Sequence, residues 1–209
     1  MIHPSMPLAW RSLLLCAGLL VLLQWGGEPV RLPLTELAAP AIVVPDLSSL
    51  PPAPRHHGPA SDNLALLAHG LFAVEGRRLP ARRVAAITEA VREAGEAYNV
   101  DPKILLAIAW RESRFRPDAI GDNGRSCGAF QIRTDIAGRP SCRRMQDLRA
   151  SARYAAFYLD WLRRHCDYGD YIAAYNGGCR GRNFPGAQRY QRTIRSIAAG
   201  DLDGLVRAR

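Results

Sequence analysis

The sequence predicts a mainly α-helical protein with one folded domain. In segment after segment beyond residue 60, apolar residues recur three and four positions apart, as on the buried face of a helix. The valine-rich alternation that is typical of half-buried strands does not occur there. The chain has 209 residues, of which 48% are apolar and 22% charged. That composition excludes a mostly disordered or collagen-like protein, and the length is enough for one well-buried core.

The first 27 residues are expected to direct export. An unbroken apolar run, LLLCAGLLVLL, covers residues 13–23 and follows Arg11. This run is too short to cross a bilayer comfortably, because a spanning helix needs about 20 residues. A basic start before a short apolar run is typical of a secretory signal. No good A-x-A cleavage site lies close behind the run. Residues 1–27 are therefore predicted to be either a cleaved signal peptide or a retained signal-anchor.

A proline-rich segment follows the apolar run. Of the 15 prolines in the chain, 8 fall between residues 28 and 60. Proline fixes its own backbone angle and disfavours helix in the residue before it. Residues 28–60 are therefore predicted to be an extended linker, and residues 61–209 the folded domain.

Six helices are expected in the folded domain. Ser61 or Asp62 can cap the first helix, and Gly76 can end it. Asp101 followed by Pro102 is a strong start signal for the third, since the carboxylate caps the helix and proline suits its first turn. The expected ranges are about 62–75, 80–98, 101–112, 146–165, 171–175 and 187–199.

Four cysteines in the folded domain predict two disulfides. Cys127, Cys142, Cys166 and Cys179 form an even set, as expected of an exported protein in an oxidising compartment, whereas Cys16 lies in the apolar run. A zinc site is the alternative, but the four include no C-x-x-C pair and no H-x-x-x-H accompanies them. Three pairings are possible. Cys127 with Cys142 and Cys166 with Cys179 would close the shortest loops and are the expected pairs.

Glu112 is the strongest candidate for a catalytic residue. It lies on the same helical stripe as Leu105 and Ile108, a place where a carboxylate is ordinarily avoided. Loss of hydration there disfavours the charged form and should raise the pKa of the carboxyl. A carboxyl that stays protonated near neutral pH can act as a general acid. The alternative is an ordinary ion pair between Glu112 and a neighbouring arginine at the helix end.

Three ordered motifs resemble a known family. E-S-R-F-x-P at residues 112–117, G-A-F-Q-I at 128–132 and A-Y-N-G-G at 174–178 resemble the lysozyme-like lytic transglycosylases of bacteria, of the soluble lytic transglycosylase type. The resemblance covers about residues 84–197. It implies a lysozyme-like α-helical catalytic domain with a cleft, acting without a metal or cofactor.

The resemblance also implies a reaction. Glu112 would be the single catalytic acid and base of a lytic transglycosylase, a glycan-cleaving lyase acting on the β-1,4 bond between N-acetylmuramic acid and N-acetylglucosamine of peptidoglycan. The same carboxylate would then take the proton of the sugar's own C6 hydroxyl, which closes a 1,6-anhydro ring. No enzymic nucleophile is needed, in contrast to the paired carboxylates of ordinary glycosidases.

Six further residues match positions that the family uses around its substrate. Gln131 would hydrogen-bond the substrate or orient the catalytic group, and Phe130 would contact a sugar face. Tyr175 would lie near the acid, and Asn176 would hold backbone or substrate. The substrate-binding residues that the resemblance implies are Ser113, Gly128, Phe130, Gln131, Tyr175 and Asn176.

Asp122 leaves the product of the reaction open. The turn ahead of the G-A-F-Q-I motif is GDNGRSC, which is more polar than is usual in the family and carries this carboxylate. If Asp122 faces the cleft, it could activate water opposite Glu112, as an inverting hydrolase requires at a carboxyl separation of about 6.5 to 9.5 Å. An Asx turn feeding Gly124 is its more ordinary role. The alternatives to a transglycosylase are thus a water-using muramidase and a non-catalytic peptidoglycan-binding protein.

One rival motif is a chance match. Residues 124–128 spell G-x-S-x-G, the nucleophile elbow of serine hydrolases. That motif needs a buried strand before it, whereas residues 116–123 are polar and contain Pro117.

The net charge of +9 comes almost wholly from arginine, because Lys103 is the single lysine. The arginines are spread over every segment and no nucleic-acid motif is present, so no nucleic-acid partner is expected. An anionic wall polymer fits the export signal better. The expected partner is the peptidoglycan glycan strand, with an envelope-spanning secretion machine as a further candidate and membrane contact only through the N-terminal segment. The expected location is the periplasm or cell envelope.

Overall fold

The structure, a computed structural model, describes residues 60–136, 138–166, 170–181 and 183–202. The predicted signal segment and residues 28–59 of the predicted linker lie outside the described residues and stay predictions. Among the described residues, none of the helices combines the length and the apolar character that a membrane span requires.

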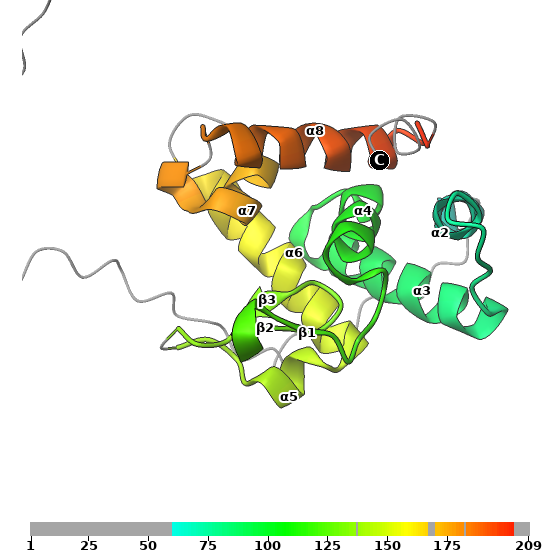
Figure 1. The fold of residues 1–209 in the computed structure, drawn as a ribbon, viewed down its shortest axis with the longest axis horizontal. Coiled ribbons are helices and arrows are strands. Elements are labelled where there is room, and N and C mark those ends of the chain that lie inside the picture. The colour runs from blue at the N-terminus through cyan, green and yellow to red at the C-terminus, as the bar shows by residue number, and fades with distance from the viewer. Residues whose placement is uncertain (1–59, 137, 167–169, 182, 203–209) are drawn as a thin grey trace, which may run out of the picture. The chain divides into compact units, whose positions relative to one another are not determined.

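The described residues are mainly helical, which confirms the predicted fold class (Figure 1). A small antiparallel sheet, in the order β1-β2-β3, lies between residues 120 and 133. The helices are α2 (Ala60–Ala73), α3 (Ala81–Tyr98), α4 (Pro102–Ser113), η4 (Asp122–Gly124, a 3-10 turn), α5 (Cys142–Met145), α6 (Leu148–His165), α7 (Tyr171–Gly181) and α8 (Pro185–Ala198). The strands are β1 (Ile120–Gly121), β2 (Ser126–Cys127) and β3 (Ile132–Arg133).

Helix α4 is the centre of the fold. Its residues 104–110 are all buried, and it packs against α2, α3, α6 and α8 (Figure 1). Asp101 caps its start by accepting a hydrogen bond from the backbone N–H of Lys103, and Pro102 occupies its first turn. A helix that is apolar on every side is stable only when other elements surround it. The packing of α4 therefore fixes where its last turn, and the residues on it, can lie.

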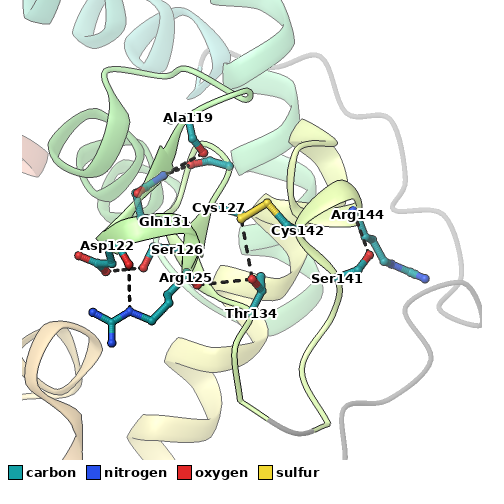
Figure 2. Close-up of a disulfide and its surroundings, with 11 residues drawn as sticks. Ala119, Asp122, Arg125, Ser126, Cys127, Gln131, Thr134, Ser141, Cys142 and Arg144 are labelled. Atoms are coloured by element: carbon teal, nitrogen blue, oxygen red, sulfur yellow. Dashed lines mark hydrogen bonds between the residues drawn. A yellow bond between two sulfur atoms is a disulfide. The ribbon is translucent and has the colours of Figure 1, made fainter.

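The first disulfide cross-links the segment between α4 and α6. Cys127 on β2 is bonded to Cys142 at the start of α5 (Figure 2). The second disulfide joins Cys166, at the end of α6, to Cys179 in α7. These are the two pairings that were predicted from loop length.

Several features of the fold were not predicted, among them the 3-10 turn η4 and the short helix α5. The strands have two residues each, which is too short to show a period-2 pattern in the sequence. Helix α7 was expected to end at Tyr175, but helical backbone continues to Gly181, across a break at Gly178, whose φ is 68°. Glycine at that position allows a left-handed residue between two helical turns.

Helix α2 lies before the motif region and covers one side of α4. Phe72 packs edge-on against Trp110, with ring centroids 5.0 Å apart, and also contacts Phe115. Just beyond the helix, Glu75 forms an ion pair with Arg114, at 2.8 Å between Oε1 and Nε. The segment before the motifs therefore contacts the turn that ends α4.

Gly128 should tolerate no side chain. Its φ is 81°, and a Cβ built on it would lie 1.8 Å from the carbonyl oxygen of Met145. We expect Gly128→Ala to lower the free energy of unfolding by at least about 2 kcal/mol, because it adds both a clash and a strained backbone. Gly186→Ala is the control, since its Cβ would meet nothing within 4 Å on helix α8. Chemical denaturation checks this, and equal stabilities of the two variants would contradict it.

Candidate active site

Glu112 is the last residue but one of the central helix α4. The chain turns sharply after it, because Arg114 and Phe115 both adopt left-handed backbone angles, with φ of 58° and 59°. A left-handed residue is a common way to end a helix, although it is usually glycine. The turn leaves the Glu112 side chain half-buried on the wall of a hollow of about 310 Å³.

The Glu112 carboxyl is bound by a tyrosine from the last helix. The hydroxyl of Tyr190 on α8 donates to Oε1 of Glu112 at 2.6 Å. Tyr190 is only 6% exposed, and burial raises the pKa of its hydroxyl well above the ordinary value. The hydroxyl therefore keeps its proton near neutral pH and can donate it to a hydrogen bond. This bond joins α8 to the end of α4.

The pKa of Glu112 is raised above its ordinary value. Loss of hydration on burial is the largest cause, and the negative charge of Asp122 adds to it. The Tyr190 hydrogen bond and the positive charge of Arg111 act in the opposite direction, because both favour the carboxylate. The Glu112 carboxyl thus keeps its proton to higher pH than an exposed glutamate does. Once the proton has left, Tyr190 and Arg111 stabilise the carboxylate.

Tyr175 lies beside this pair. Its ring is stacked nearly parallel to that of Tyr190, with centroids 6.5 Å apart, and its hydroxyl donates to the Phe130 carbonyl at 2.8 Å. Burial, followed by the negative charge of Glu112, raises the pKa of Tyr175 well above its ordinary value. Tyr175 was expected near the acid; the charge of Glu112 reaches it, whereas the hydrogen bond to Glu112 comes from Tyr190.

Gln131 organises the turn around the small sheet. Its backbone φ is 48°, and its side-chain amide donates to the carbonyl oxygens of Ala119 and Gly128, at 3.2 and 2.9 Å (Figure 2). Its Oε1 also lies so close to Gly121 that a Cβ there would be 2.2 Å away. The structure thus shows Gln131 holding backbone, while its contact with substrate stays a prediction.

Three of the predicted binding residues lie inside the fold. Ser113 is 4% exposed; its hydroxyl donates to Ala129 and Ala109 carbonyls and accepts from the backbone N–H of Arg116. Gly128 is buried against α5. The expected sugar contact of Phe130 is wrong for this conformation, because the ring is fully buried in the core. These residues position the G-A-F-Q-I segment against the end of α4.

Asp122 is exposed and lies in η4, with a left-handed φ of 50°. Its carboxylate accepts a hydrogen bond from the Ser126 hydroxyl (Figure 2). Its backbone carbonyl also accepts from the backbone N–H and from Nε of Arg125. The carboxylate is near enough for its charge to raise the pKa of Glu112. Asp122 is therefore the second acidic group of the site.

Asn176 borders a second hollow. This hollow, of about 450 Å³, lies along α4 and α8, and its lining includes Asn176, Tyr190, Arg111 and Arg189. Asn176 is exposed. Asn176 and Tyr190 thus line the same hollow, which is large enough for a sugar unit.

The sequence alone did not single out Tyr190. It lies on the buried stripe of α8 with Ala187, Ile194 and Ile197, where a tyrosine is typical of core packing. The one feature that could have indicated its role is its hydroxyl, because a buried tyrosine hydroxyl needs a hydrogen-bond partner. Of the residues predicted for the site, Glu112, Tyr175 and Asn176 are brought together around Tyr190, whereas Ser113, Gly128 and Phe130 support them from inside the fold.

A helical domain with a partly buried glutamate at the end of its central helix is consistent with the lysozyme-like class. A family described as the transglycosylase SLT domain matches residues 89–197, just over half of the chain, so the chain belongs to this family. The matched range includes Glu112 and Tyr190 and excludes α2.

Curated relatives match a shorter segment. Proteins called X polypeptide, from Escherichia coli and from its strain K12, are 48% identical over 42 residues. That segment is 19% of this chain and 25% of each relative. The match thus spans about a quarter of the length of these relatives.

The bond from Tyr190 can be tested by Tyr190→Phe. Because this hydrogen bond lowers the pKa of Glu112, its removal should raise that pKa further. A general acid must be protonated, so activity falls as pH rises through its pKa. The alkaline limb of kcat/KM should therefore move to higher pH in the variant, while the maximum falls at least about tenfold, since bonds to charged groups contribute about 1.5 to 3 kcal/mol.

Tyr98→Phe is the matched control. The Tyr98 hydroxyl is buried and has no hydrogen-bond partner among the described residues, so its removal should leave the pH profile in place. An unchanged alkaline limb in Tyr190→Phe, or the same shift in both variants, would contradict the role given to Tyr190.

Proposed function

We propose that the protein is a peptidoglycan lytic transglycosylase that cleaves the β-1,4 bond between N-acetylmuramic acid and N-acetylglucosamine and forms a 1,6-anhydro product. Membership of the transglycosylase family gives the class of activity. The observation that carries the proposal is the Glu112 carboxyl, which is desolvated and bound by Tyr190. Such a group can first give and then take a proton.

In the first step, Glu112 donates its proton to the glycosidic oxygen. The bond from this oxygen to C1 of the muramic acid breaks, the leaving sugar takes the electron pair, and positive charge develops at C1. Glu112 is now a carboxylate. The Tyr190 hydroxyl and the charge of Arg111 both favour that form, so the site is arranged to stabilise the state that the first step creates.

In the second step, the C6 hydroxyl of the same sugar attacks C1. Its proton passes to the Glu112 carboxylate, the 1,6-anhydro ring closes, and the catalytic group returns to its starting state. One carboxyl is enough for both steps. This fits the finding that Glu112 is the desolvated carboxyl to which the site's tyrosine is bonded.

A water-using muramidase is the second candidate, because of Asp122. This carboxylate is close enough to influence Glu112 and is exposed, as a base that activates water would be. Its hydrogen bond with Ser126 and the bonds of Arg125 to its carbonyl favour a role in holding the turn. The transglycosylase is therefore the preferred proposal.

The proposed location is the periplasm or cell envelope, with the peptidoglycan glycan strand as substrate. The two disulfides support an oxidising compartment. Export through the N-terminal segment, with or without its retention as an anchor, and association with a secretion machine are parts of the same proposal and come from the sequence.

Glu112→Gln should remove turnover and leave glycan binding. The amide keeps the shape of the side chain and can still accept from Tyr190, but it has no acidic proton to transfer, so we expect a loss of at least about 10² in kcat. Glu96→Gln is the control, because it makes the same chemical change at an exposed position of helix α3, outside both hollows. Turnover of purified peptidoglycan measures both; activity of Glu112→Gln within tenfold of the parent would refute the assignment.

Asp122→Asn separates the two candidate reactions. In the substrate-assisted route Asp122 is not a base, so most activity should remain, whereas loss of a general base would cost about 10² to 10⁴-fold. Digestion in heavy-oxygen water, followed by mass spectrometry, gives the independent reading. We expect products that lack one water at the muramic acid end and carry no label. Label at that end would show that water was the acceptor and would favour the muramidase.

A further inference from the structure

A hollow lined by arginines opens beside the catalytic glutamate. It is about 310 Å³ in volume and is bounded by the end of α2, the following loop, the start of α3 and the turn after α4. The residues that line it are Phe72, Arg77, Arg83, Glu112, Ser113, Arg114 and Arg116. We call Arg77, Arg83, Arg114 and Arg116 the arginine cluster. Four guanidinium groups against one carboxyl make this hollow strongly positive.

The positive charge of the cluster is only partly offset. Glu75 forms ion pairs with Arg114 and with Arg77, and the second is long, at 3.6 Å. Within the described residues, no ion pair involves Arg83 or Arg116. Both are exposed, and the Nε of Arg116 donates to the Ser113 carbonyl, which leaves the outer edge of its guanidinium for another acceptor.

The cluster and the catalytic glutamate share one hollow, because Glu112 is part of the same lining. Arg111, whose charge lowers the pKa of Glu112, is not a member of the cluster. An anion bound by the cluster would therefore lie in the hollow that Glu112 borders, where a substituent on a bound strand can reach it.

Two members of the cluster lie outside the range that the family matches. Arg77 follows α2 and Arg83 is in the first turn of α3, whereas the match begins at residue 89. Arg77 is held in place by stacking over the Phe72 ring, with 5.4 Å from its Cζ to the ring centroid. The segment that adds α2 to the domain thus also supplies half of this positive surface.

We propose that the arginine cluster binds a carboxylate of the peptide side chains of peptidoglycan, so that the enzyme prefers peptide-bearing strands to stripped ones. The proposal rests on the proposed function. Peptides branch from the lactyl group of muramic acid, the sugar whose C1 bond breaks, and they carry free carboxylates. Arginine binds a carboxylate through two parallel hydrogen bonds, which gives direction as well as attraction.

The test compares two double variants on three substrates. Arg77→Ala with Arg83→Ala removes two charges from the hollow, and Arg78→Ala with Arg82→Ala removes two exposed charges from the same segment that do not line it. The substrates are peptide-bearing glycan strands, strands from which an amidase has removed the peptides, and chitin oligomers, which carry no carboxylate. Thermal melting of each variant checks that it is folded.

The readout is the ratio of kcat/KM on peptide-bearing strands to that on stripped strands. We expect a ratio well above one for the parent and for the Arg78, Arg82 control, and a ratio about tenfold lower for the Arg77, Arg83 variant. The preference should also weaken as salt is raised, because the cluster is open to solvent.

Other outcomes overturn the proposal in distinguishable ways. A parent ratio near one, or equal losses in the two double variants, would refute the peptide site while leaving the transglycosylase intact. A loss on stripped strands alone would assign the cluster to the lactyl carboxylate in place of the peptide, because this carboxyl is an amide in peptide-bearing strands and is freed when the amidase removes the peptide. A parent that cleaves neither kind of strand would refute the proposed function itself.

Discussion

The hydrogen bond between Tyr190 and Glu112 is the interaction around which the site is built. It joins the last helix to the end of the central one, at a place where burial raises the pKa of the carboxyl. Burial favours the acid, and the bond favours the carboxylate. A group that must give a proton and then take another needs both influences, because either alone would hold it in one state.

Contacts within the protein hold Tyr190 and Glu112 in place. Ser113 ties the end of α4 to the Ala129 carbonyl, and Tyr175 ties α7 to the Phe130 carbonyl. The Cys127–Cys142 disulfide and the close approach of Gly128 to Met145 hold the same segment from its other side. Motif residues thus divide into those that face the site and those that position its backbone.

The helices could be predicted from the sequence because their caps and their 3.6-residue pattern are local signals. Asp101 and Pro102 begin α4 where expected, and Glu112 stood out as a carboxyl on an apolar stripe. The small sheet could not be predicted, because its two-residue strands show no period. Tyr190 was missed although its helix was predicted, because a tyrosine on a buried stripe is usually a core residue. Nothing in the sequence pattern distinguishes it from one whose hydroxyl binds the candidate acid. Phe130 sits in a motif, yet only the three-dimensional packing shows that its ring is inside.

The pKa of Glu112 is the quantity on which the account depends most directly. It can be measured by carbon-13 NMR of glutamate side-chain carboxyls as pH is varied, with the Glu112→Gln protein identifying the signal. We expect a midpoint above the ordinary value of a glutamate, and a higher one still in Tyr190→Phe. A midpoint at or below the ordinary value would contradict it, because Glu112 would then be a solvated carboxylate and could not serve as the acid.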